Sequence, residues 1–128
     1  MRTKPALVYA DADGVLTLSG SDARLKMAIA DLASEVDVLA ALASLRGVTF
    51  NWDTSRQPAV NPGNRREIGL IAQEVEAVLP HVVGERADGL KTLDYAKLTA
   101  FLIEVTKAQQ REIGALRTEV AAMRERLP

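Results

Sequence analysis

The spacing of apolar residues between positions 25 and 45 predicts one continuous helix. Apolar residues recur there every three or four positions, which places them along one helical face. Gly47 follows as a typical helix stop. The positions of this face are Leu25, Ile29, Leu32, Val36, Leu39, Leu42 and Leu45.

Shorter segments on both sides of this helix have the patterns of strands. Residues 6–20 contain two β-rich runs separated by Asp13-Gly14, a tight-turn signal that predicts an extended hairpin. Residues 48–52 alternate between apolar and polar side chains. This period of two predicts a half-buried strand.

The middle of the chain predicts a loop followed by small elements. Residues 53–66 contain two of the five prolines and few apolar residues, which indicates an exposed loop. The apolar run 68–71 then predicts a return to the core. Residues 72–79 have the pattern of a two-turn helix stopped by Pro80, and residues 81–94 predict two brief strands around a Gly-bounded turn.

Residues 95–127 predict a helix of about 30 residues, roughly 45–50 Å long, with Asp94 as its N-cap. The segment contains no Pro and a single Gly. Gln109 interrupts its apolar seam, and the two consecutive spacings of four around this residue insert a stutter into a heptad pattern. The apolar positions are Leu98, Leu102, Val105, Ile113, Leu116, Val120, Met123 and Leu127.

The apolar stripe of this predicted helix is narrow, and the helix is too long to fold back on a small domain. Both features favour oligomerisation over packing of the helix on its own domain. Its mixture of Leu, Val, Ile and Met does not choose between two and three strands. We therefore predict an α+β fold, in which a small mixed helix and strand domain carries a long C-terminal helix that forms a coiled coil.

Composition narrows the functional classes. The chain has 128 residues, 48% of them hydrophobic, and 16 basic against 17 acidic side chains, which predicts one soluble folded domain with no general attraction to nucleic acid or an anionic membrane. With no Cys and one His, thiolate and multi-histidine metal sites are excluded, and we expect no cofactor. The apolar run at residues 6–10 is too short for a signal peptide core or a membrane span.

The segment SDARLK, residues 21–26, offers a nucleophile and a base. A serine hydroxyl becomes a useful nucleophile when a neighbouring base takes its proton, and a neutral lysine can be that base. On a continuous helix Ser21 and Lys26 would point about 140° apart, so they can meet only if Ser21 precedes the helix. Composition and spacing alone favour Ser21 as a helix N-cap and Lys26 as a solvated side chain.

A second candidate is the segment DADGVLT, residues 11–17, which resembles the first motif of the haloacid-dehalogenase phosphatases. In that chemistry Asp11 would attack phosphate, with Asp13 protonating the leaving group. A later acidic pair that holds Mg²⁺ is also needed, and no convincing one follows a strand downstream. We interpret Asp13-Gly14 as a turn.

Four ordered blocks resemble the intramolecular chaperone domain of phage endosialidases and related tailspikes and tail fibres, a domain type also found in some animal membrane-bound transcription factors. The resemblance covers about residues 21–108 and implies that residues 1–20 are the remnant of an upstream fibre or tailspike segment. Residues 21–128 would then be the chaperone domain, with 95–127 as its long helix. The blocks are SDARLKMAI, LRGVTFNW, IGLIAQEVEAVLPHVV and GLKTLDYAKLTAFLIEVTK.

The resemblance implies a homotrimer, joined through the C-terminal helix, that helps the upstream domain of the same chain to fold and then releases itself. The release would be a single-turnover serine endopeptidase reaction at Gly20–Ser21, with Ser21 as nucleophile and Lys26 as general base. Such a module would act in the host cytoplasm during phage assembly and be absent from the mature particle. It would bind neither nucleic acid nor membrane.

Two further residues of the first block match the family. The resemblance implies orienting or structural roles for Asp22 and Arg24, and we expect Arg24 to pair with a carboxylate such as Glu74 or Glu76. The alternative function is a non-catalytic trimerisation and capping module of a fibre protein. In that case Ser21 is only a helix N-cap.

Overall fold

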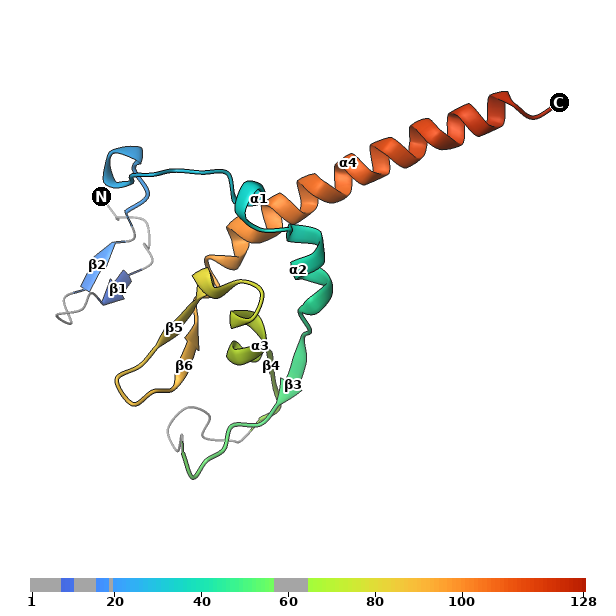
Figure 1. Cartoon of the computed structure of the whole chain (residues 1–128). Helices are drawn as coiled ribbons and strands as arrows, with labels where there is room; N and C mark the ends of the chain where they lie inside the picture. Colours follow the sequence, from blue (N-terminus) through green and yellow to red (C-terminus); the bar gives the residue numbers. More distant parts are fainter. Residues whose placement is uncertain (1–7, 11–15, 19, 57–64) are drawn as a thin grey trace, which may run out of the picture. The chain divides into compact units, whose positions relative to one another are not determined.

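The computed structural model describes residues 8–10, 16–18, 20–56 and 65–128. They form small hairpins, short helices and one long helix, so the α+β class predicted from the sequence is confirmed (Figure 1). The chain divides into two compact units, Met1–Asp31 and Leu32–Pro128. The elements are β1 Val8–Ala10, β2 Leu16–Leu18, the 3-10 turn η1 Ala23–Leu25, α1 Leu32–Glu35, α2 Val38–Ser44, β3 Val48–Phe50, β4 Glu67–Gly69, α3 Ala72–Glu76, the 3-10 turn η2 Pro80–Val82, β5 Val83–Glu85, β6 Lys91–Leu93 and α4 Leu98–Glu125.

The first unit contains the predicted hairpin. Strands β1 and β2 pair antiparallel, with Val8 opposite Leu18. The turn expected at Asp13-Gly14 lies outside the described residues, and so does Asp11, the nucleophile of the phosphatase reading.

The prediction of one continuous helix over 25–45 is wrong. The chain forms η1, α1 and α2 instead, because Ala28 has a left-handed φ of 52° and the side chain of Asp37 starts a new helix by accepting a hydrogen bond from Ala40 N at 3.1 Å. Leu25 and Ile29 are each 72% exposed, so the first two positions of the predicted apolar face do not face the core.

The core of the second unit lies where α2, α3 and η2 meet the first half of α4. Contacts join α4 to both α1 and α2, and α3 packs beside β5 and β6. The face of α4 that packs inward is spaced by four and three residues, as expected for one side of a helix. The buried residues are Val38, Ala41, Val75, Leu79, Val82, Phe101, Val105 and Ala108.

Two further hairpins confirm the predicted strands. Strand β3 shows the expected alternation of burial and pairs antiparallel with β4, while β5 and β6 pair around a turn in which Gly89 has a φ of +82°. The predicted return of the run 68–71 to the core is confirmed for Leu70, which packs against the core, but not for Ile68, which is 82% exposed on β4. The hydroxyl of Tyr95 accepts a hydrogen bond from Leu70 N at 3.0 Å, which ties the start of α4 to the end of β4.

The predicted long helix is confirmed as α4, which has 28 residues and begins three residues later than expected. Asp94 caps the turn before it, where its carboxylate accepts from Ala96 N at 3.1 Å. From Arg111 to Pro128 every residue is exposed, so the second half of the helix extends beyond its own domain. No helix in the described part of the chain is long and apolar enough to cross a membrane.

Candidate functional site

A tight turn shapes the segment that contains the candidate nucleophile and base. Asp22 is extended, with φ −63° and ψ 138°, and its carboxylate accepts from Arg24 N at 2.8 Å. Its carbonyl accepts from Leu25 N at 3.0 Å, and Lys26 N donates to Ala23 O at 3.1 Å. These bonds close η1 as a single 3-10 turn. The backbone then leaves the helical conformation instead of continuing as an α-helix.

The turn brings Ser21 and Lys26 together. Lys26 Nζ lies 2.8 Å from Ser21 Oγ, a hydrogen bond between side chains five residues apart. The divergence expected on a continuous α-helix does not arise, because Ser21 precedes the turn and Lys26 follows it. Both side chains are exposed. Their separation suits direct proton transfer between the hydroxyl and the amine.

Asp22 and Arg24 form an ion pair beside these two residues. Arg24 Nε donates to Asp22 Oδ1 at 3.0 Å and Arg24 Nη2 donates to Oδ2 at 2.9 Å, so both carboxylate oxygens are engaged. The side chain of Arg24, assisted by its backbone N–H, holds the pKa of the Asp22 carboxyl below its usual value. Asp22 is therefore the N-cap of the turn, the place that spacing alone gave to Ser21.

Arg24 and the glutamates of α3, which the sequence analysis expected to pair, have other partners within their own units. Glu74 instead accepts from Arg46, with nitrogen to oxygen distances of 2.8 to 3.1 Å, and Glu76 lies 3.1 Å from Lys91 Nζ. Arg24 pairs with Asp22 because the turn holds the carboxylate of Asp22, two residues earlier in the chain, close to the guanidinium of Arg24.

Gly20 permits a close approach within the same segment. A Cβ at this position would lie 2.8 Å from Cδ1 of Leu25, so a larger residue would push this side chain away. Leu25 itself is exposed, as are Met27 at 89% and Ile29 at 72%. The sequence analysis did not predict this exposure, because helical periodicity assigned Leu25 and Ile29 to a core face.

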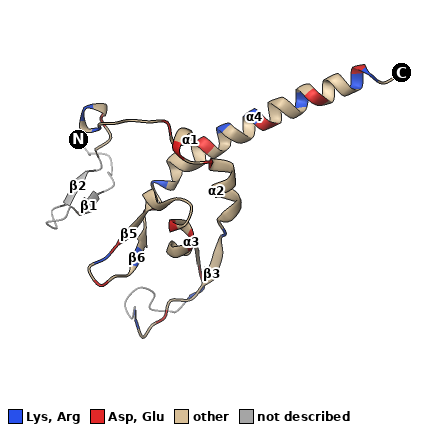
Figure 2. Ribbon diagram, viewed as in Figure 1, with Lys and Arg blue, Asp and Glu red and all other residues tan. Residues whose placement is uncertain are grey.

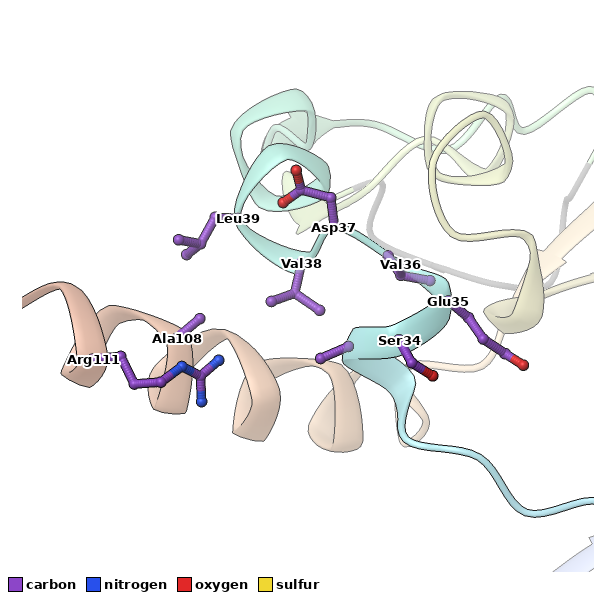
Figure 3. A pocket seen from close by; sticks show the side chains of 9 residues that line it. Ser34, Glu35, Val36, Asp37, Val38, Leu39, Ala108 and Arg111 are labelled. Carbon is purple, nitrogen blue, oxygen red and sulfur yellow. The ribbon is translucent and has the colours of Figure 1, made fainter.

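Two of the surface hollows are lined by described residues of the second unit. The larger, of about 710 Å³, lies between the β3–β4 and β5–β6 hairpins, and Phe50, Trp52, Ile68, Leu90 and Tyr95 supply much of its apolar lining. The smaller, of about 370 Å³, lies between the α1–α2 segment and α4, where Val38 points toward Ala108 and Arg111 lies at the edge (Figure 3). No group of three metal-ligating side chains occurs among the residues that the structure describes.

Comparison with known proteins adds a family and a relative. A family model described as "Chaperone of endosialidase", Peptidase S74, matches residues 21–84, which are 64 of the 128 residues. The match begins at Ser21. The long tail fiber protein Gp37 of Salmonella phage S16 is 31% identical over 108 residues, which are 82% of this chain and 14% of that protein. The chain thus spans about a seventh of the length of this relative.

Proposed function

The chain belongs to the Peptidase S74 family, the chaperones of endosialidase, and from this premise we propose that it is a self-releasing chaperone module of a phage tail fibre. It trimerises through α4, promotes folding and assembly of an upstream fibre domain of the same chain, and then cuts the bond between Gly20 and Ser21. The tail fibre context is supported by the Salmonella phage relative.

One observation carries the self-cleavage part of this proposal, namely the 2.8 Å contact between Lys26 Nζ and Ser21 Oγ. A serine needs a base within hydrogen-bond reach of its hydroxyl, and Lys26 lies within it. The family match begins at Ser21 and includes Lys26.

The proposed reaction transfers an acyl group within the chain and then to water. Ser21 Oγ attacks the carbonyl carbon of Gly20 through a five-membered ring, while its proton passes to the neutral amine of Lys26. The C–N bond breaks as Lys26 returns this proton to the nitrogen of Ser21, which leaves an ester between the two residues. Water hydrolyses the ester, giving a Gly20 carboxylate and a free hydroxyl and amine on Ser21.

The exposure of the pair favours cleavage late in assembly. A lysine is a base only in its neutral form, and removal from water favours that form. Ser21 and Lys26 are exposed in the single chain, beside the exposed apolar side chains of Leu25 and Met27. Covering this apolar segment in the assembled fibre would remove water from the Lys26 amine. Cleavage would therefore follow the folding of the upstream domain.

The chaperone role follows from the physics of fibre folding. Strands that pair between three chains gain nothing until the entropy of association and of loop closure has been overcome. A trimeric module holds the three upstream segments at an effective concentration of about millimolar. Once the connection is cut, unfolded chains lose their nucleus, so the finished fibre is kinetically trapped.

The direct test follows the wild-type chain joined to its natural upstream domain. Intact mass, N-terminal sequence and sedimentation are measured over time after synthesis. We expect an upstream trimer and a released fragment that begins at Ser21. A stable uncut trimer would instead support the non-catalytic capping module, and a chain that stays monomeric would contradict both functions.

Asp22 provides a test of the turn as a positioning device. Asp22→Ala removes the cap and the ion pair and is expected to slow self-cleavage about five- to tenfold, the equilibrium factor typical of a lost helix cap. Asp22→Asn keeps a capping oxygen and should recover most of the rate. Because the pKa of Asp22 is lowered from 3.8, its ion pair is present at neutral pH and is lost only as the pH falls below that value. Equal rates for the wild type and both variants would remove Asp22 from the mechanism.

A further inference from the structure

The 3-10 turn η1 brings two pairs of residues together, each pair five positions apart in the chain. Lys26 Nζ lies 2.8 Å from Ser21 Oγ. On the N-terminal side of the bond proposed to break, Leu25 Cδ1 lies 2.8 Å from the position that a Cβ on Gly20 would take. The same turn therefore places the nucleophile beside its base and the acyl residue beside a leucine.

The side chain of Leu25 fills the space in which a side chain at position 20 would begin. Carbon atoms in contact lie about 3.5–4.0 Å apart. A methyl group on Gly20, 2.8 Å from Leu25 Cδ1, would therefore overlap it. Glycine has no Cβ, so it fits here without a shift of its neighbour. Leu25 thus makes position 20 sensitive to the size of its residue.

The backbone at position 20 does not itself require glycine. The φ of Gly20 lies outside the left-handed region, unlike that of Gly89, which is +82°. An alanine can adopt such a backbone without strain. The obstacle to a side chain at position 20 is therefore the side chain of Leu25, and a smaller residue in place of Leu25 would remove it.

The core of the protein does not hold Leu25 in its place. Its side chain is 72% exposed, the same fraction as that of Ile29. Arg24 and Lys26 are its neighbours in the sequence, and Figure 2 shows basic residues at this turn in blue. Substitution of so exposed a residue usually changes stability little. The contact between Leu25 and Gly20 can therefore be tested without loss of the fold.

We propose that Leu25 determines which residue can precede the cut, because it closes the space beside the α-carbon of position 20 and favours glycine over every larger residue. This inference rests on self-cleavage at Gly20–Ser21 in the proposed function and adds the specificity of that reaction. A fibre chain with a different upstream domain would be released fastest when glycine precedes Ser21.

The physical reason lies in the alignment needed for attack. Ser21 Oγ must reach the carbonyl carbon of residue 20 while the turn keeps Lys26 beside the hydroxyl. A larger residue at position 20 avoids the overlap with Leu25 by shifting its own backbone or by opening the turn. In either case a smaller fraction of the molecules is ready to react, and the rate falls by that fraction.

The test measures cleavage of the full chain, with its natural upstream domain, for several residues at position 20 in different backgrounds. Gly20→Ala is expected to cut about three- to tenfold more slowly than the wild type, the factor typical of a side chain forced away from its rotamer, and Gly20→Val more slowly still. In a chain that carries Leu25→Ala, adding Gly20→Ala should not slow the cut further. Leu25→Met keeps a side chain that reaches position 20 and should keep most of the penalty.

Two matched controls separate this contact from general effects of the substitutions. Gly47→Ala makes the same change at a glycine where, apart from its chain neighbours, no described atom lies within 4 Å of a Cβ. This variant should cut at the wild-type rate. Ile29→Ala removes a side chain as exposed as that of Leu25 and should not relieve the penalty of Gly20→Ala.

The possible results distinguish this inference from the proposed function. Equal rates for Gly20→Ala and the wild type would overturn the inference, while self-cleavage would stand. A penalty of the same size with and without the Leu25 side chain would also overturn it and assign the penalty to crowding of the acyl carbon itself. A wild-type chain that is never cut at Gly20–Ser21 would be a failure of the proposed function, and its specificity would fall with it. Sedimentation of each variant checks that the rates compare equally assembled chains.

Discussion

Lys26→Met should leave the fibre chain uncut, while the protein still assembles as the wild type does. Methionine keeps the length and the apolar stem of the lysine but removes the amine that lies 2.8 Å from Ser21 Oγ. Loss of a general base typically costs 10²- to 10⁴-fold in rate, so the cut should disappear on the time scale of wild-type release. Ser21→Ala, which removes the nucleophile, should have the same result. Intact mass of the full chain over time measures both.

Two companion variants make this prediction specific. Ser21→Cys replaces the hydroxyl by a better intrinsic nucleophile, so it should still cut, and adding Lys26→Met should slow it less than Lys26→Met slows the serine protein. Lys97→Met removes a different exposed lysine, whose partner is Asp94, and should cut at the wild-type rate. Normal cleavage by the Lys26→Met chain would remove Lys26 from the reaction and leave Ser21 with another base.

The elements with regular patterns were predictable from the sequence, and the interrupted helix was not. Alternation identified β3, and the absence of Pro identified α4, because in both segments the local pattern and the packing agree. The prediction of one helix over 25–45 was wrong because apolar periodicity contains no information about the backbone at Ala28. The left-handed φ of this residue interrupts the helical conformation. Asp37 was a readable signal, since an Asp just before an apolar run is a typical N-cap.

The sequence did not predict the shape of the candidate site. The family resemblance supplied Ser21 and Lys26, whereas composition and spacing alone favoured Ser21 as a helix N-cap and Lys26 as a solvated side chain. What brings them together is a 3-10 turn closed by Asp22, and a turn of three residues leaves no periodic signal. The pairing of Arg24 with Asp22 was missed for a related reason, because it depends on the same closed turn.

Packing divides the single amphipathic pattern of α4 between a buried face and an exposed face. Read as one stripe, the apolar positions of α4 require a stutter, because Val105 and Leu102 are assigned to the same face. Burial separates them, since Val105 is 3% exposed and Leu102 is 51% exposed. One helix therefore has two kinds of apolar position, a buried face in its first half that belongs to the core and exposed positions on a neighbouring face.

Phe101 should be the residue on which the stability of the second unit depends most. Its side chain is 2% exposed and is among the largest completely enclosed side chains described, together with Leu79 and Val75. Phe101→Ala removes a buried ring and leaves a cavity, which typically costs about 3–5 kcal/mol. Small domains are stable by only about 5–15 kcal/mol, so the variant should approach the limit of folding. At roughly 4–8 °C per kcal/mol, the midpoint of thermal unfolding should fall by at least about 12 °C.

Ile103→Ala is the matched control for this loss, because Ile103 lies on the same helix and is 55% exposed. Substitutions of such surface residues usually change stability by less than about 0.5 kcal/mol. Melting of both variants is followed by far-UV circular dichroism at one subunit concentration, since the midpoint of an oligomer depends on concentration. Phe101→Leu, which keeps most of the buried volume, should fall between Phe101→Ala and the wild type. If the midpoint of thermal unfolding of Phe101→Ala lies within a few degrees of the Ile103→Ala value, contacts between copies hold α4 in position, and the core of its own domain does not.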